Sequence, residues 1–273
     1  MSEIDLHIHT KYSDGEYDEK EIIKKILDTK IKEFAICDHD TIVGSKKVFY
    51  ELKKENYGLI FHTGIEFSSI ISDYLNGINV HLLVRDFDFK NKKILKLIKK
   101  IKKFRIIKIR RMLNYIEKIY KTKISKNLVR KKLKETESFG KPHIYELLKN
   151  YGNFDMEEYY QNINKLYTDD LKLDVKDIFN ALKNENGNVT LAHPIEIMKE
   201  YDLDYNDIDK IVEYLTKLGL YGIEVFHSNQ TKENQKEFSK IAKKYNLYQS
   251  YGSDYHGENI KPNVKLGKCY LEN

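Results

Sequence analysis

Several familiar sequence signals are scarce or missing in this chain of 273 residues. It holds two cysteines, too few for a disulfide framework, and the apolar run around Cys37 is typical of a reduced core residue. No stretch of about 18 uncharged apolar residues occurs, so we expect no membrane span. A basic stretch followed by an apolar one, typical of a secretory signal, is not seen at the N-terminus. We therefore expect a cytoplasmic protein.

Patterns that indicate a covalent nucleophile are also missing, because no Ser-His-Asp or Cys-His arrangement stands out. The net charge is +6, and much of the basic excess lies in residues 90–134. A basic segment of this kind can attract a phosphate-rich partner. An ordinary solvated helix face explains it equally well, so the charge alone does not choose between the two interpretations.

The chain is long enough for one large domain, or for one domain with an insertion, and 41% hydrophobic residues suffice for a core. Short runs rich in Ile and Val alternate with longer amphipathic stretches. The predicted strands are 4–9, 33–38, 59–67, 79–84, 188–193, 222–227 and 248–254. The predicted helices between them are 18–28, 45–55, 175–184, 205–218 and 232–245. Such alternation is typical of parallel strands covered by helices.

Nine histidines are the most informative feature that is present. His7 and His9 stand two residues apart in an apolar run, which puts both rings on one face of a strand. A buried strand face usually carries aliphatic side chains, whereas neutral imidazole is the commonest metal ligand. Several other histidines stand beside carboxylates, as in Asp38-His39-Asp40. A single histidine is more often structural, but the repeated placement favours a metal site.

The candidate ligands mark the ends of predicted strands in most cases. They are His7, His9, Asp14, His39, Glu66, His81, His193, Asp254 and His256. Strand ends converge on one rim when a sheet closes around an axis, so we predict a distorted (β/α)7 TIM-like barrel. Residues 86–175 interrupt the alternation and have a helical pattern. We interpret them as a helical insertion domain forming one wall of a substrate cleft, with residues 1–85 and 176–273 forming the barrel domain.

Imidazole and carboxylate ligands together suit zinc, manganese or iron. Nine ligands exceed what one ion needs, so we expect two or three divalent metal ions, with Glu66 as the natural bridging carboxylate. Ions about 3.5–4 Å apart can clamp the attacking and leaving oxygens of a phosphoryl displacement, and they deprotonate a bridging water near neutral pH. The pattern therefore indicates metal-assisted phosphoester hydrolysis.

Six motifs resemble, in order, the polymerase and histidinol phosphatase (PHP) family. They are His7-Ile8-His9, Ser13-Asp14-Gly15, Cys37-Asp38-His39-Asp40, Gly64-Ile65-Glu66, Leu191-Ala192-His193-Pro194 and Gly252-Ser253-Asp254-Tyr255-His256. The resemblance implies a distorted (β/α)7 barrel with a trinuclear metal site that hydrolyses phosphoesters. By motif position, it implies one metal held by His7, His9, Glu66 and Asp254. A second would be held by Glu66, His81 and His193, and a third by Asp14, His39 and His256.

Further motifs are similar to one branch of that family, which contains nucleoside 3′,5′-bisphosphate phosphatases and 5′→3′ oligoribonucleotide exonucleases. These motifs are Gly140-Lys141-Pro142-His143-Ile144, Gly222-Ile223-Glu224-Val225-Phe226-His227 and Lys265-Leu266-Gly267. The chain departs from that branch at Lys141, where arginine is expected. A lysine cannot make the bidentate phosphate contact of arginine, which puts the orientation of the substrate in doubt.

The remaining polar candidates can be explained either by a functional role or by an ordinary structural one. We expect substrate contacts from Lys11, Arg85, Lys141, His143 and His227, although surface solvation or structural hydrogen bonding explains each of them as well. The predicted catalytic residues are Glu66, His227, Asp254 and His256. We interpret His62 as structural, and Asp38 as a residue that orients a metal ligand.

These observations predict a metal-dependent phosphoesterase. Its expected substrate is a nucleotide phosphomonoester, such as a nucleoside 3′,5′-bisphosphate, or the 5′ end of short RNA, with attack by a metal-activated hydroxide. One alternative is a small-molecule phosphatase such as histidinol-phosphate phosphatase. Another is a non-catalytic nucleic-acid-binding module, which only the basic insertion supports. We expect no membrane association, and no obligate protein partner is evident.

Overall fold

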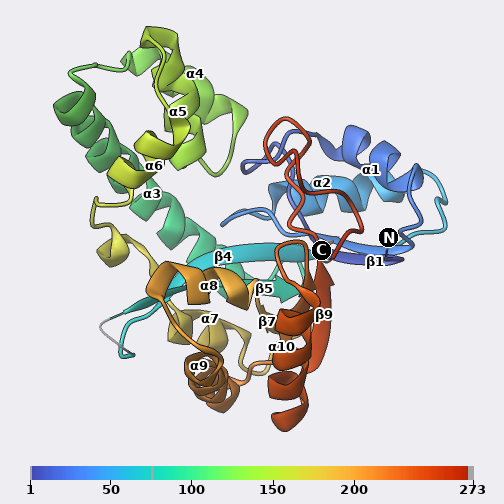
Figure 1. Ribbon diagram of the computed structural model, residues 1–273. Coiled ribbons are helices and arrows are strands. Elements are labelled where there is room, and N and C mark those ends of the chain that lie inside the picture. Colours follow the sequence, from blue (N-terminus) through green and yellow to red (C-terminus); the bar gives the residue numbers. More distant parts are fainter. Residues whose placement is uncertain (1, 75–76, 270–273) are drawn as a thin grey trace.

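The computed structural model describes residues 2–74 and 77–269, and Figure 1 shows the arrangement of their helices and strands. The strands within these ranges form a three-stranded and a six-stranded sheet. The smaller sheet has the order β1 (Ile4–Ile8), β2 (Glu33–Ile36), β3 (Ile60–His62). The larger has the order β6 (Leu173–Asp174), β4 (Gly64–Ile71), β5 (Ile78–Arg85), β7 (Asn188–Leu191), β8 (Gly222–His227), β9 (Tyr248–Gly252). The mixed α/β class predicted from the sequence is confirmed.

Two seams join the sheets. At one seam, the His9 amide donates to the Tyr255 carbonyl at 2.9 Å, next to a parallel bridge between Ile8 and Tyr255. At the other, His39 bridges Glu66, and the Asp40 amide donates to the Glu66 carbonyl at 2.8 Å. The end of β1 therefore lies beside the chain after β9, and the chain after β2 lies beside β4. Both seams carry candidate metal ligands.

Strand β5 departs from the expected all-parallel order, because it is antiparallel to both β4 and β7. Its last residue, Arg85, is therefore level with Gly64 and Asn188, the first residues of the neighbouring strands. Arg85 is 3% exposed and donates to the hydroxyls of Ser250 and Thr190. The expectation that Arg85 lies at the rim and contacts phosphate is corrected, since it assumed that this strand runs the other way.

Helices cover the sheets through regular apolar faces. In α1 (Glu19–Leu27), an Asp18–Glu21 capping box starts the helix and its isoleucines are buried. The other helices flanking the sheets are α2 (Val43–Leu52), α7 (Val175–Leu182), α8 (Pro194–Tyr201), α9 (Tyr205–Leu218) and α10 (Lys232–Lys244). Helix α8 was not among the predicted helices; it starts directly after His193 with a proline at its first position.

Residues 86–175 are largely helical, as expected. They form α3 (Lys92–Tyr120), α4 (Lys126–Glu135), α5 (Lys141–Leu148) and α6 (Met156–Ile163), with short 3₁₀ turns at Lys149–Tyr151 and Asp169–Leu171. Helix α3 belongs to two cores, because Ile94 and Ile98 pack with the sheet cluster whereas Ile109 and Met112 pack with α4, α5 and α6. Figure 1 shows α3 running from the sheet to the other three helices. Within the described ranges, no helix combines the length and apolarity needed to cross a bilayer.

His62 joins two strands to the chain after β5 through carboxylates. Its Nδ1 lies 2.6 Å from Asp86 Oδ1, and its Nε2 lies 2.9 Å from Glu33 Oε1. The hydrogen bond to Asp86 raises the pKa of His62 against the opposing effect of burial. These contacts support the structural role expected for His62.

The His62 contacts predict a pH-dependent contribution to stability. Since its pKa is higher in the folded chain, the contribution is complete below the unfolded pKa of about 6.5 and disappears as pH rises through the folded pKa. We expect His62→Gln to lower Tm by about 2–4 °C at pH 6. At pH 9 the difference from the wild type should be smaller, because more of the folded His62 has lost its proton. Calorimetry of both proteins at both pH values checks this, and an equal loss at pH 6 and pH 9 would contradict it.

Candidate metal centre

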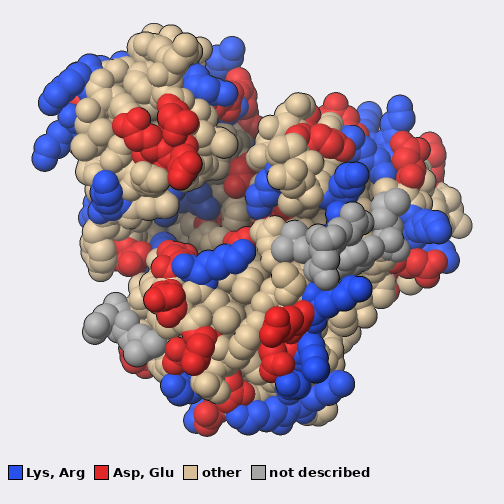
Figure 2. All heavy atoms as spheres, in the orientation of Figure 1, with Lys and Arg blue, Asp and Glu red and all other residues tan. Residues whose placement is uncertain are grey.

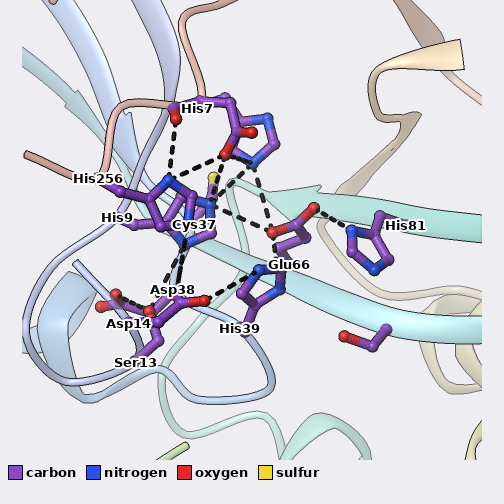
Figure 3. A network of polar contacts seen from close by, with 12 residues as sticks. His7, His9, Ser13, Asp14, Cys37, Asp38, His39, Glu66, His81 and His256 are labelled. Carbon is purple, nitrogen blue, oxygen red and sulfur yellow. Dashed lines mark hydrogen bonds and ion pairs between the residues drawn. The ribbon is translucent and has the colours of Figure 1, made fainter. Parts of the chain in front are cut away.

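Glu66, in β4, is the centre of a buried histidine cluster (Figure 3). Its Oε2 lies 2.9 Å from His39 Nδ1, and its Oε1 lies 2.8 Å from His81 Nδ1. Three more imidazole nitrogens lie within 3.4 Å of the same carboxylate, from His7, His9 and His193. Burial opposes ionisation of Glu66, but the neighbouring His39 and His81 rings hold its pKa well below the usual range. One ionised carboxylate therefore faces five imidazoles.

Two further carboxylates extend this cluster. Asp254 Oδ1 lies 3.2 Å from His9 Nε2 and 3.3 Å from His256 Nδ1. Asp14 lies 3.4 Å from His256 Nε2, and 3.7 Å from both His9 and His39. All nine ligands predicted from the sequence therefore lie in one connected cluster. Their strands and loops are far apart in the sequence, and several of the candidates, such as His9, His39 and Glu66, lie at the two seams.

The donor set fits divalent cations. Three groups drawn from the predicted ligands each bring their ligand atoms within 4.8 Å of one another: His9, Asp14, His39 and His256; His7, His9 and Glu66; and His39, Glu66 and His81. Several buried atoms there have close polar neighbours but no hydrogen bond of acceptable geometry among the described residues, including Asp14 Oδ1, Glu66 Oε2 and His81 Nδ1. Buried unpaired acceptors are costly unless a cation neutralises them.

The hydrogen bonds on the outer ring nitrogens also suit metal binding. His7 Nδ1 lies 3.2 Å from Glu224 Oε1, and His256 Nδ1 lies 2.9 Å from the Asp254 carbonyl. A proton on each Nδ1 leaves the Nε2 lone pair facing the cluster, which is the form that binds a metal. Burial and then the His256 ring lower the pKa of His9 to about 4, so this imidazole is neutral at pH 7.

Glu224 is a site residue that sequence analysis did not assign, although its motif was noted. It is fully buried in β8, and its Oε2 accepts the His193 amide proton at 2.8 Å while its Oε1 faces His7. A Cβ at Gly252 would approach Glu224 Oε1 to 2.0 Å, so only glycine fits there. Glu224 thus positions two candidate ligands from outside the cluster.

Asp38 and Asp5 support the cluster through backbone and hydroxyl groups. Asp38 accepts from the Thr10 amide at 2.7 Å, and from the Thr10 and Ser13 hydroxyls at 2.6 Å. It therefore holds the loop between His9 and Asp14, which agrees with the expected orienting role. Asp5 accepts from the amides of Ser253 and Gly267 at 2.9 Å. Only their burial and partners distinguish these carboxylates from surface acids.

A cavity of about 760 Å³ opens onto the cluster, and Figure 2 shows a hollow with basic side chains between the α3–α6 part and the sheets. Two predicted substrate residues, Lys11 and His143, line this cavity. Lys11 pairs with Asp18 at 2.9 Å, and His143 Nδ1 accepts from the Gly140 amide at 3.1 Å. Lys261, which sequence analysis missed, lines it as well and pairs with Asp254 at 2.5 Å.

The two remaining substrate candidates lie on either side of the cluster. Lys141, at the start of α5, lines a smaller neighbouring cavity, and its amine donates to Asn164. His227, at the end of β8, is buried, with its Nε2 3.9 Å from Asp254 Oδ2. Of the five predicted substrate contacts, the structure brings all but Arg85 to the cavities or the cluster.

Comparison with known proteins gives a consistent result. A family model described as "PHP domain" matches residues 5–189. The chain is 25% identical to a "5'-3' exoribonuclease" of Haemophilus influenzae, covering 92% of this chain and 89% of that relative. It is 24% identical to a "Phosphoribosyl 1,2-cyclic phosphate 1,2-diphosphodiesterase" of Eggerthella lenta, covering 93% and 94%.

Solved structures show the same fold. A structure from Bifidobacterium adolescentis, described as a metal-dependent phosphoesterase, superimposes with a TM-score of 0.80 at 24% identity, covering 98% of this chain and 92% of that one. An amidohydrolase from Chromobacterium violaceum with bound sulfate and no metal gives 0.79 at 22% identity, covering 95% and 90%. At these identities the likeness concerns the fold.

The contacts of Glu224 predict a specific loss in metal binding. Glu224→Gln leaves one acceptor oxygen for two donors, so His7 loses its orientation, and we expect Mn²⁺ affinity to fall by about 10- to 100-fold. Electron paramagnetic resonance of free Mn²⁺ measures this. Glu233→Gln is the control, because it makes the same chemical change at an exposed position of α10. Equal Mn²⁺ affinity in Glu224→Gln and the wild type, or an equal loss in Glu233→Gln, would contradict the assignment.

Proposed function

Because the chain belongs to the PHP domain family and is a metal-dependent phosphoesterase, we propose that it hydrolyses a nucleotide phosphomonoester, such as a nucleoside 3′,5′-bisphosphate, or the 5′ end of short RNA. The observation that carries the proposal is the nine-ligand cluster, three members of which, Asp14, His39 and His256, line a cavity whose walls carry both lysines and carboxylates. The exoribonuclease name of one relative supports an RNA or nucleotide substrate.

In this proposal the cluster holds two or three manganese, zinc or iron ions in the sets expected from the sequence. The first set is His7, His9, Glu66 and Asp254; the second is Glu66, His81 and His193; the third is Asp14, His39 and His256. Bound divalent cations supply charge stabilisation for phosphoryl oxygens and lower the pKa of water. Glu66 belongs to two sets because both of its oxygens face imidazoles.

The proposed proton donor to the departing oxygen is His227 or a water associated with His256, and the contacts of His227 suit the role. Its Nδ1 accepts from the Asn229 amide at 3.2 Å, so in the neutral ring the proton is on Nε2. That atom has no hydrogen-bond partner in the described residues and lies on the Asp254 side of the cluster. Asp254 would orient this donor, and Lys261 would balance the charge of Asp254. His256 keeps its Nε2 lone pair toward Asp14.

The architecture proposed for this function is the distorted (β/α)7 barrel with residues 86–175 as an inserted helical domain. The two seams that join the sheets support closure. The separate apolar cluster of α3 to α6 supports an inserted unit. In this arrangement His143 and Lys141 of α5 contact the substrate from the insertion, and Lys11 contacts it from the rim.

A small-molecule phosphatase remains the second candidate. The observation in its favour is the relative from Eggerthella lenta, which is named for a phosphorylated sugar substrate. Turnover of histidinol phosphate and of adenosine 3′,5′-bisphosphate separates the two candidates, and we expect a higher kcat/KM for the bisphosphate.

The test of the main proposal is phosphate release by the Mn²⁺-loaded protein. We expect hydrolysis of adenosine 3′,5′-bisphosphate, and a loss of about 10²-fold or more in kcat for Glu66→Ala, because the shared carboxylate is removed. Glu233→Ala, at an exposed position of α10, is the control and should retain activity. Full activity of Glu66→Ala, or of the wild type after exhaustive chelation, would contradict the mechanism.

A further inference from the structure

Helix α3 carries a row of cations on the face that points away from the sheet. Lysines and arginines recur along its 29 residues, and its acidic residue is Glu117. Ile94, Ile98 and Ile101 are buried against the sheet cluster. Because each residue turns an α-helix by about 100°, a set of exposed cations lies roughly half a turn from these isoleucines. We call this set the outer stripe: Lys92, Lys96, Lys99, Lys103 and Arg110.

The cations on either side of the outer stripe are neutralised by acids of neighbouring segments. Four such ion pairs are formed, namely Lys93–Glu185, Lys100–Asp177, Lys102–Glu137 and Arg111–Asp170. In contrast, within residues 2–74 and 77–269 no member of the outer stripe has an ion pair or a side-chain hydrogen bond. The acids that face α3 therefore leave the outer stripe without a counter-ion.

The charges of the outer stripe are arranged unfavourably for the helix itself. Lys92 and Lys96 stand four residues apart, as do Lys99 and Lys103, a spacing at which like charges destabilise a helix. Lys92 also lies in the first turn, which contains no acid and where the helix dipole disfavours a cation. A bound polyanion would offset both effects, so the arrangement suits a partner that carries many negative charges.

The packing of α3 favours a nucleic-acid strand over a membrane as that partner. A helix that lies on a membrane inserts its apolar face among the lipids. The apolar face of α3 is not free to do so, because residues such as Ile98 and Met112 are buried in two hydrophobic clusters. From Lys92 to Arg110 the outer stripe is about 27 Å long at a rise of 1.5 Å per residue. A row of cations of this length fits the repeated phosphates of a strand.

We propose that the outer stripe binds the phosphate backbone of an RNA strand. The inference rests on the proposed function and deepens it, because it adds a binding surface for RNA outside the cavities. Arg105, which lines the smaller cavity, lies on the opposite side of the helix from the outer stripe. Lysine and arginine contacts with phosphate do not read bases, so the surface binds RNA of any sequence and favours longer strands.

The test measures fluorescence anisotropy of a labelled phosphorothioate strand of about 20 ribonucleotides, which keeps the backbone charge and resists hydrolysis. The stripe variant combines Lys92→Gln, Lys96→Gln, Lys99→Gln and Lys103→Gln. The control combines Lys232→Gln, Lys236→Gln, Lys240→Gln and Lys243→Gln, which make the same charge change at exposed positions of α10. Both variants therefore have the same net charge, and only the place of the change differs.

We expect the stripe variant to bind the strand about 10-fold or more weakly than the control. Its plot of log K against log salt should be flatter by about 2–3, since each phosphate contact on a single strand contributes about 0.7 to the slope. Its Tm should not fall, because glutamine and lysine have similar helix propensities and repulsion is removed. Equal affinities and slopes in the two variants would overturn the proposal.

A charge-retaining variant shows whether charge is the cause. Lys92→Arg, Lys96→Arg, Lys99→Arg and Lys103→Arg together should bind the strand as tightly as the control does, and a loss like that of the glutamine variant would overturn the proposal. Vesicles containing phosphatidylserine test the other polyanion. If the stripe variant loses vesicle binding while its RNA affinity equals that of the control, the surface belongs to a membrane and the proposal fails.

Hydrolysis of adenosine 3′,5′-bisphosphate, measured separately, distinguishes failure of this proposal from failure of the proposed function. If the wild type hydrolyses no phosphoester but RNA binding depends on the outer stripe, the surface stands and the proposed reaction fails. If the wild type hydrolyses the bisphosphate and both glutamine variants bind RNA equally, the reaction stands and the surface fails.

Discussion

The contact of one buried carboxylate with five imidazoles is the constraint on which the structure depends. Glu66 is in reach of ring nitrogens from β1, the loop after β2, β5 and the chain after β7. Such a concentration of polar groups without water or a counter-ion is unfavourable in a protein interior. A bound cation would offset it, which couples metal binding to the stability of the whole assembly of strands.

Two residues of the cluster have an unfavourable backbone conformation. His193 and Asp254 have positive φ values of 26° and 56°, an uncommon conformation for residues other than glycine. A backbone hydrogen bond holds each of them: the His193 amide donates to Glu224, and the Asp254 amide donates to the His7 carbonyl. Buried carboxylates and glycines such as Gly252 therefore determine the direction in which the ligands point.

Much of this could be predicted from the sequence, because the histidines mark strand ends. The apolar periodicity predicted both ends of β8 and of α9 correctly. The positions of histidines and carboxylates identified nine candidate ligands, which lie together in the structure. Strand direction could not be predicted in the same way, since an apolar run has no polarity, and so Arg85 was expected at the wrong end of β5. Glu224 was missed because its role comes from burial and neighbours, which spacing does not reveal.

The helical segment is packed on the sheet through one long helix that belongs to two hydrophobic cores. Helix α3 packs on the sheet through its first half and on α4 to α6 through its second, so its basic side chains are carried to the edge of the ligand cluster. The central claim remains that the ligands hold metal. Anomalous diffraction at the zinc edge from crystals equilibrated with Zn²⁺ tests it most directly. The account predicts peaks about 2.0–2.2 Å from Glu66 oxygens and from the imidazole nitrogens around them. Zinc found only at surface sites, with no peak within reach of Glu66, would contradict it.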